Sequence, residues 1–465
     1  GDLVTATDAR SNTTTYTYDG NHQMLTIVDP RLNTVVTNTY DASSRVVQYQ
    51  TDAKGGGTSY VYDPANRQTT ITDALGQNIV HRFDELLRLI EEVDASGNSR
   101  FYYYDSAGNR IQVTDKNGNA NKYEYDVSGN VTKKTDALGK VTNIAYFPDD
   151  NPQSRTDALG NTTTFAYDAN GNLTTTTDAL GNATTIAYFA NGLPQTITNA
   201  RAFASTNTFD IEGNLTQVVD SLGNTTQHTY DGVGRRTSTT NARGHTTAFT
   251  YDANDNLLTI TDPNGKVITH IYDANNNRIS TQDKNGNVTL YSYDEKDLLT
   301  STTDALTQTT VNGYDAIDRR ISVQDKKGNQ TQYEYDAIGN LIKATDALSN
   351  MNQFTYDPNG NRLSSTNELG LTSQFGYDLL NRRVSVMDPL GNTTTTAYDA
   401  LGRIISTTNA KGQSTGFVYD ALGRLLEVHD ANGGTVSYAY DSNGNRISMT
   451  DPNGNTTTYT YDALD

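Results

Sequence analysis

The chain lacks several features on which common classes of protein function depend. None of its 465 residues is a cysteine, which excludes disulfide bonds and thiol chemistry. It contains no apolar run of about 18 residues, so no segment is predicted to span a membrane. The net charge is −19 and the basic residues do not cluster, which argues against nucleic acids and anionic membrane surfaces as partners.

The usual signatures of catalysis are missing as well. There is no Gly-x-Ser-x-Gly elbow, no phosphate-binding loop and no His-Glu-x-x-His. The six histidines show no spacing typical of metal ligands; they are His22, His81, His228, His245, His270 and His429. We therefore predict that the chain is not an enzyme and that it needs no cofactor and no metal.

Oxygen-rich runs of the type Asp-x-Asn-x-Asn leave calcium as an alternative. They occur at 115–119, 168–172 and 252–256. Calcium loops of the helix-loop-helix type need a later glycine and a terminal glutamate, and both are missing here. Turn formation by the same Asp and Asn side chains is the preferred interpretation.

What the chain does have is a strict repeat. A Tyr-Asp type position recurs from Tyr62 to Tyr461 in 19 steps of 21 residues, with Phe83 and Phe209 in place of the tyrosine. Two earlier copies, Tyr18 and Tyr40, follow steps of 22 residues. A fixed period of this length is typical of one structural unit that is copied and stacked. Residues 1–465 are therefore predicted to form a single array, and this array is expected to be a piece of a longer chain.

Each repeat carries two turn signals about ten residues apart. In the copy at 167–182 they are Asp-Ala-Asn-Gly-Asn and Asp-Ala-Leu-Gly-Asn. Between them lie short runs rich in Thr, Val, Ile, Tyr and Phe that alternate with a period of two, as in Ile321 and Val323 around Ser322. The pattern predicts two antiparallel strands per repeat, with one packed face and one wetter face, and an all-β fold without helices.

About 22 such repeats cannot remain a flat sheet. Their ~44 strands, at ~4.8 Å each, would extend over about 210 Å, whereas open sheets twist and curl well before that length. We expect the sheet to coil as a spiral that forms a hollow shell or tube.

Two kinds of position are predicted to carry this structure. The tyrosines are expected to stabilise the sheet, and the Asp and Gly residues of the second turn to fix its register, because Asp caps turns and Gly accepts positive φ. The representative positions are Tyr104, Tyr125, Tyr167, Tyr230, Tyr251, Tyr335, Tyr398, Tyr419, Asp115, Asp178, Asp262, Gly118, Gly181 and Gly265.

Pairs of tyrosines two residues apart, such as Tyr123 and Tyr125, leave a second use open. Aromatic rows can stack on sugars, although they more often pack against cross-strand neighbours. Glycans therefore remain an alternative partner.

Units such as Tyr398-Asp399-Ala400-Leu401-Gly402-Arg403 and 419–425 resemble the YD repeat of the RHS family, and in this chain such units are usually followed by Asp-x-x-Gly-Asn. The resemblance covers essentially the whole chain. It implies a large spiral β-shell, which in bacterial toxin systems encloses a toxin domain and in the related teneurins belongs to a cell-surface protein.

Three functional hypotheses follow from the repeat pattern and from what this resemblance implies. The first is a non-enzymatic shell that encloses or displays a toxin or another domain of an exported bacterial protein. The second is an extracellular fibre or tube built from identical subunits end to end. The third is a carbohydrate-binding surface adhesin. All three place the protein outside the cell or on its surface.

Overall fold

The computed structural model describes residues 1–464, and all regular structure within them is β-strand. The predicted all-β fold is confirmed: there are 44 strands, each antiparallel to the strands before and after it in the sequence. The described residues contain no helix that could cross a membrane.

The even-numbered strands other than β44 end at the Tyr-Asp position, and we call the turns at this position Tyr-Asp turns. Their bounds are β2 (Thr13–Tyr18), β4 (Thr34–Tyr40), β6 (Gly57–Asp63), β8 (Asn78–Phe83), β10 (Ser99–Tyr104), β12 (Ala120–Tyr125), β14 (Val141–Tyr146), β16 (Thr162–Tyr167), β18 (Ala183–Tyr188), β20 (Ala204–Phe209), β22 (Thr225–Tyr230), β24 (Thr246–Tyr251), β26 (Val267–Tyr272), β28 (Val288–Tyr293), β30 (Thr309–Tyr314), β32 (Gln330–Tyr335), β34 (Met351–Tyr356), β36 (Thr372–Tyr377), β38 (Thr393–Tyr398), β40 (Ser414–Tyr419), β42 (Thr435–Tyr440) and β44 (Thr456–Thr458).

The odd-numbered strands lead into the second kind of turn, which we call Thr-Asp turns. Their bounds are β1 (Thr5–Thr7), β3 (Met24–Val28), β5 (Val47–Asp52), β7 (Gln68–Thr72), β9 (Leu89–Val93), β11 (Arg110–Thr114), β13 (Val131–Thr135), β15 (Pro152–Thr156), β17 (Leu173–Thr177), β19 (Pro194–Thr198), β21 (Leu215–Val219), β23 (Arg236–Thr240), β25 (Leu257–Thr261), β27 (Arg278–Gln282), β29 (Leu299–Thr303), β31 (Arg320–Gln324), β33 (Leu341–Thr345), β35 (Arg362–Thr366), β37 (Arg383–Met387), β39 (Ile404–Thr408), β41 (Leu425–His429) and β43 (Arg446–Thr450).

The two kinds of turn lie on opposite rims of the sheet, because each strand runs antiparallel to the next. They also differ in register. At the end of β12 the pairing slips between Glu124 and Tyr125, whereas β11 and β12 pair without a slip at the Thr-Asp end. Such a bulge adds one residue to one strand and increases the local twist. The slip recurs at most Tyr-Asp turns.

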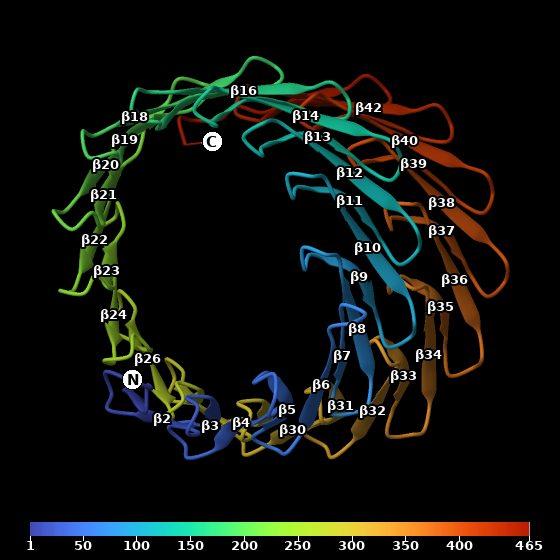
Figure 1. Ribbon diagram of the computed structural model, residues 1–465. Helices are drawn as coiled ribbons and strands as arrows, with labels where there is room; N and C mark the ends of the chain where they lie inside the picture. The colour runs from blue at the N-terminus through green and yellow to red at the C-terminus, as the bar shows by residue number, and fades with distance from the viewer. Residues whose placement is uncertain (465) are drawn as a thin grey trace.

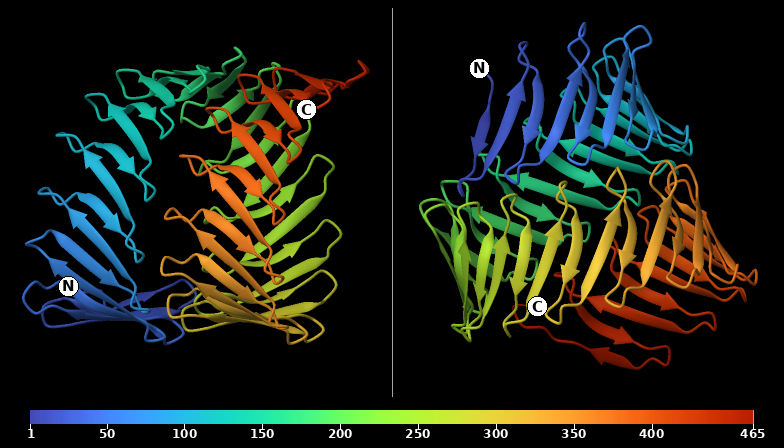
Figure 2. Two further views of the ribbon diagram at one scale, coloured as in Figure 1. Left: turned by 90° about the vertical axis from the view of Figure 1, so that its right-hand side faces the viewer. Right: turned by 90° about the horizontal axis from the view of Figure 1, so that it is seen from below.

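The sheet coils as a hollow spiral, as predicted (Figure 1). Contacts between residues about 242 positions apart, such as Ser221 Oγ to the carbonyl of Ala463, define one coil. We call residues 1–242 the first coil and residues 243–464 the second coil. The second coil lies beside the first along the spiral axis (Figure 2).

The sheet is a single layer, and this differs from the expectation of one packed face. Strands such as β12 do alternate between half-buried and exposed side chains, with Tyr123 and Tyr125 half-buried. However, no apolar side chain among the described residues is fully buried. The reason is that no second sheet or helix covers either face, so each side chain is screened only by its neighbours in the sheet.

Candidate functional site

The predicted tyrosines close the open end of each hairpin. The hydroxyl of Tyr125 donates to the carbonyl of Arg110, 15 residues earlier, at 2.9 Å, and Tyr335 does the same to Arg320 at 2.8 Å. The acceptor is the first residue of the preceding strand, so the bond ties β12 to the start of β11. The same bond is made by Tyr104, Tyr230, Tyr251, Tyr398 and Tyr419.

Tyr167 is the exception among the predicted tyrosines. No such bond forms between its hydroxyl and position 152, which is a proline, within the described chain. Instead its ring meets the edge of Phe147, with the ring centroids 6.1 Å apart. Burial raises the pKa of this tyrosine.

The predicted aspartates cap their turns. One carboxylate oxygen of Asp178 accepts the backbone N–H groups of Leu180 and Asn182, both at 2.9 Å, and the other accepts the side-chain amide of Asn182. Asp115 and Asp262 accept the equivalent pairs of backbone N–H groups. The bond from the Lys284 ammonium to Asp262, together with these N–H groups, holds the pKa of that carboxyl below its usual value.

The glycines sit where the chain needs a left-handed backbone. The φ angles of Gly118, Gly181 and Gly265 are 86°, 83° and 78°. The five residues that replace this glycine in the sequence also have positive φ; they are Ser11, Leu32, Ala202, Thr307 and Ser349. Several of these turns contain an Asn-Gly pair, such as Asn117-Gly118, which is common in two-residue hairpin loops that need a positive φ at both residues. Here only the glycine has a positive φ, so the Asp-capped turn ends in a single left-handed residue.

Sequence reasoning missed a role for the arginine that ends several Tyr-Asp turns. The Nε of Arg403 donates to Asp399 at 2.6 Å, and its Nη1 donates to the carbonyl of Asp420 in the next Tyr-Asp turn at 2.9 Å. Its guanidinium also lies 4.8 Å from the ring centre of Tyr419. Arg88, Arg235, Arg319, Arg382 and Arg424 repeat this arrangement. The recurrence of a Gly-Arg pair at the end of these turns, as in Gly402-Arg403, is the sequence signal that could have indicated this role.

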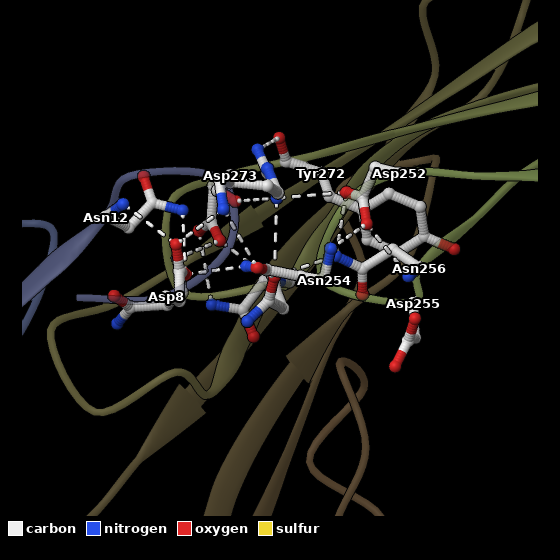
Figure 3. A network of polar contacts seen from close by, with 12 residues as sticks. Asp8, Asn12, Asp252, Asn254, Asp255, Asn256, Tyr272 and Asp273 are labelled. Atoms are coloured by element: carbon white, nitrogen blue, oxygen red, sulfur yellow. Dashed lines mark hydrogen bonds and ion pairs between the residues drawn. The ribbon is translucent and has the colours of Figure 1, made fainter. Parts of the chain in front are cut away.

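The two coils meet through their turns, which sequence reasoning also missed. Thr-Asp turns of the first coil face Tyr-Asp turns of the second (Figure 3). The side-chain amide of Asn254 donates to Asp8 at 2.6 Å, and Arg10 donates to the carbonyl of Asp273 at 2.9 Å. We call this line of contacts the seam.

Cations at the third position of a Thr-Asp turn pair with aspartates across the seam. Arg10 lies 3.4 Å from Asp252, and Lys54 lies 3.0 Å from Asp294. In the opposite direction, Lys296 of the second coil binds Asp52 at 2.6 Å. Arg31 and Arg201 make comparable pairs with Asp273 and Asp441.

The described residues contain no group of three or more His, Asp or Glu side chains arranged to hold a metal ion. Within the Asp-x-Asn-x-Asn run, Asp168 already accepts the backbone N–H groups of Asn170 and Asn172. His270 donates to or accepts from Thr281 at 3.1 Å, and burial lowers its pKa. These groups act in the turns and strands themselves.

Comparison with known proteins agrees with this architecture. The model of the RHS repeat matches residues 1–34, 40–77, 83–120, 148–183, 210–246, 230–267, 251–288 and 272–309, and that of the teneurin YD-shell matches residues 313–465. No curated protein matches the chain.

Solved structures of toxin complexes share the fold. A crystal structure of TcdB2-TccC3 aligns with a TM-score of 0.66 at 16% identity, over 98% of this chain and 32% of that one. The Tc holotoxin pore of Photorhabdus luminescens aligns with a TM-score of 0.64 at 15% identity, over 95% and 27%. The chain thus spans about a third of the length of these relatives. Because the RHS repeat alone matches more than half of its residues, the chain belongs to the RHS repeat family.

Proposed function

We propose that the chain is a non-enzymatic segment of wall that encloses a toxin or another domain of an exported bacterial protein. The observation that carries this proposal is the hollow two-coil spiral itself, which surrounds an open centre (Figure 1) and has no second layer. A single-layer wall leaves the space inside the coil available to another polypeptide.

The polar groups of the chain support a structural role. The Tyr hydroxyls, the turn carboxylates and the Arg guanidinium groups are engaged in the sheet, as at Tyr419, Asp420 and Arg403. Catalysis requires groups that are free to reach a substrate. We therefore assign these recurring groups the role of stabilising the wall, and any toxic activity would belong to the enclosed domain.

A carbohydrate-binding role gains no comparable support. Arginines lie over at least one ring of several tyrosine pairs. Arg446, for example, lies 5.7 Å from the ring centre of Tyr438, which is paired with Tyr440, and 4.8 Å from that of Tyr459, which is paired with Tyr461. Sugars stack on free aromatic faces, and these faces carry guanidinium groups instead.

Cryo-electron microscopy of the natural gene product, purified at its native length, tests the enclosure. We expect hollow particles with additional density inside the coil, and proteolysis that spares the enclosed segment until the wall is unfolded. An empty coil, with every other segment of the protein digested as fast as a free polypeptide, would contradict the proposal.

A further inference from the structure

The seam pairs like with like along nearly all of its length. Its register places the third residue of each first-coil Thr-Asp turn opposite the third residue of a second-coil Tyr-Asp turn. Apolar residues face apolar residues, and polar residues face polar ones, with Ser96 and Ile338 as the one mixed pair. The apolar pairs are Leu75–Ile317, Leu138–Leu380, Leu159–Leu401, Leu180–Leu422 and Leu222–Leu464, and the polar pairs are Arg10–Asn254, Arg31–Asn275, Lys54–Lys296, Asn117–Asn359 and Arg201–Asn443.

A hollow of about 280 Å³ lies in the seam at the mixed pair. Its apolar lining comes from Ile79 and Ala95 of the first coil and from Ile317, Ala337 and Ile338 of the second. The side chain of Ile79 is 41% exposed, so apolar surface in the hollow remains uncovered. No aromatic residue lines it.

The charged lining of the hollow is mostly acidic. It consists of Asp73, Glu92 and Asp94, with Lys116 as the single cation. The Lys116 ammonium lies 2.7 Å from Asp94, and this pair is largely buried. Glu92 makes no side-chain hydrogen bond within the described residues, and its ion-pair partner His81 lies 3.8 Å away. The charges of Asp73 and Glu92 are therefore not balanced by Lys116.

One oxygen of Asp73 is also free. The other oxygen caps its turn by accepting the backbone N–H groups of Leu75 and Gln77. In most of these turns an asparagine four residues on donates to the second carboxylate oxygen, as Asn182 does to Asp178. Asp73 has Gln77 at that place, and its second oxygen accepts no hydrogen bond in the part of the chain that the structure describes.

Glu92 is the unusual member of this group. No other repeat has an acidic residue two positions before the Asp or Asn of its Thr-Asp turn. The hollow thus combines a recurring turn carboxylate with a second carboxylate that occurs only here.

The repeats themselves show which group such turn carboxylates bind. In three turns the aspartate receives the ammonium of a lysine 22 positions later; the pairs are Asp94–Lys116, Asp262–Lys284 and Asp304–Lys326. The residue 22 positions after Asp73 is Ala95, which lines the hollow. The space that a lysine side chain would fill at this turn is therefore open.

We propose that this hollow binds an alkylammonium group, with the alkyl chain against its isoleucines and the ammonium at the carboxylates of Asp73 and Glu92. A long side chain of this kind places its apolar stem on apolar surface and its charge at the edge. The absence of an aromatic ring in the lining favours an aliphatic ammonium over guanidinium and quaternary cations, which bind to ring faces. The site goes beyond the enclosure proposed above and does not depend on it.

Titration with hexylammonium tests the site in the whole chain. The δ1-methyl NMR signals of the isoleucines report binding, at about pH 8, where an ordinary histidine is neutral. We expect saturable shifts of Ile79, Ile317 and Ile338 with a dissociation constant of about 1 mM. Hexanol, which has the same chain without the charge, should bind at least about fivefold more weakly.

Two variants alter the hollow in different ways. Glu92→Gln should weaken hexylammonium binding about fivefold, because it removes one carboxylate. Ala95→Lys introduces the residue found naturally at position 116, and its own ammonium should occupy Asp73 and abolish binding.

Matched controls carry the same substitutions elsewhere. Glu85→Gln neutralises an exposed acid outside the hollow, and Ala158→Lys places a lysine at the equivalent position of another seam turn. Both should leave the dissociation constant unchanged. Circular dichroism establishes that each variant is folded.

A short peptide with one lysine and no other charge identifies the source of the group. If it shifts the same isoleucines, the site takes a lysine side chain of a polypeptide. If only hexylammonium shifts them, the site takes a free amine.

The absence of saturable shifts up to about 20 mM of both probes would overturn the proposal. Equal affinities for hexylammonium and hexanol would also overturn it, since the hollow would then be merely apolar. Full binding in both Glu92→Gln and Ala95→Lys would place the amine elsewhere. None of these results would bear on the enclosure.

Discussion

Individual side chains in this protein stabilise the sheet from its surface, because there is no interior to fill. The Tyr335 ring is half-buried, its hydroxyl bonds to the carbonyl of Arg320, and the guanidinium of Arg319 lies 4.9 Å from the ring centre. A tyrosine therefore contributes a hydrogen bond, a cation–π contact and partial burial at once.

Replacing this tyrosine separates its contributions. We expect Tyr335→Phe to lower the free energy of unfolding by about 0.5–1.5 kcal/mol, since it removes only the hydroxyl bond. Tyr335→Ala should cost roughly 2–3 kcal/mol, less than the ~3–5 kcal/mol typical of fully buried aromatic residues. Urea unfolding followed by circular dichroism measures both.

Tyr103→Phe is the matched control, because Tyr103 is exposed and its hydroxyl makes no hydrogen bond within the described residues. Its unfolding midpoint should not move. Equal losses for Tyr103→Phe and Tyr335→Phe would refute a specific role for the bond to Arg320.

At the scale of the hairpin, the left-handed glycine decides how each turn ends. A Cβ at Gly265 would meet no atom within 4 Å, so the requirement for glycine comes from its φ of 78° and not from crowding. L-residues pay a conformational cost in this region.

Gly265→Ala should therefore destabilise its hairpin by about 1–2 kcal/mol. Gly232→Ala is the comparison: that position is equally open, but its φ is not positive. Hydrogen exchange reports the local loss, measured for the amides of β25 and β26 in Gly265→Ala and for those of β22 and β23 in Gly232→Ala. Equal exchange in the two variants would show that φ does not set the stability of the turn.

The hairpin is also the scale at which the sequence was most informative. Period-two alternation and turn residues are local signals, so the strands, the Asp caps and the all-β class could be predicted from one repeat. The bond from Tyr335 to Arg320 and the bond from Arg403 to Asp420 could not be predicted in this way. They join positions 15 and 17 residues apart, through side-chain directions that composition does not encode.

At the scale of the whole molecule, the spiral depends on many turn carboxylates that must remain ionised. Side-chain amides four residues on, with backbone N–H groups, hold the pKa of Asp168, Asp283, Asp325, Asp346 and Asp451 below the usual value. The number of repeats per coil and the seam arise from contacts 240 or more residues apart, which explains why the sequence predicted a spiral but not its register.

These lowered pKa values predict acid sensitivity. A carboxyl whose pKa is depressed by folding stabilises the protein above its unfolded value, and this stabilisation is lost as the pH falls through the folded value. The melting temperature should thus be constant near neutral pH and decline below about pH 4.

Scanning calorimetry between neutral pH and about pH 2 measures this decline. Asp168→Asn provides the control, because Asn also caps turns in this chain, as Asn199 does. Its own contribution to the pH dependence should vanish. A melting temperature that rises on acidification would contradict the assignment.

The matched seam has a consequence for how such a chain can change its length. One coil comprises 242 residues, or eleven and a half 21-residue repeats, so every turn sits over a turn of the other kind. Deletion of a single repeat between two facing turns would leave each remaining hairpin intact, yet it would place Lys54 opposite Ile317 in place of Lys296, Leu180 opposite Asn443 in place of Leu422, and Arg31 opposite Lys296 in place of Asn275. Repeats can therefore be gained or lost without disturbing the seam only in an array that is too short to form a second coil.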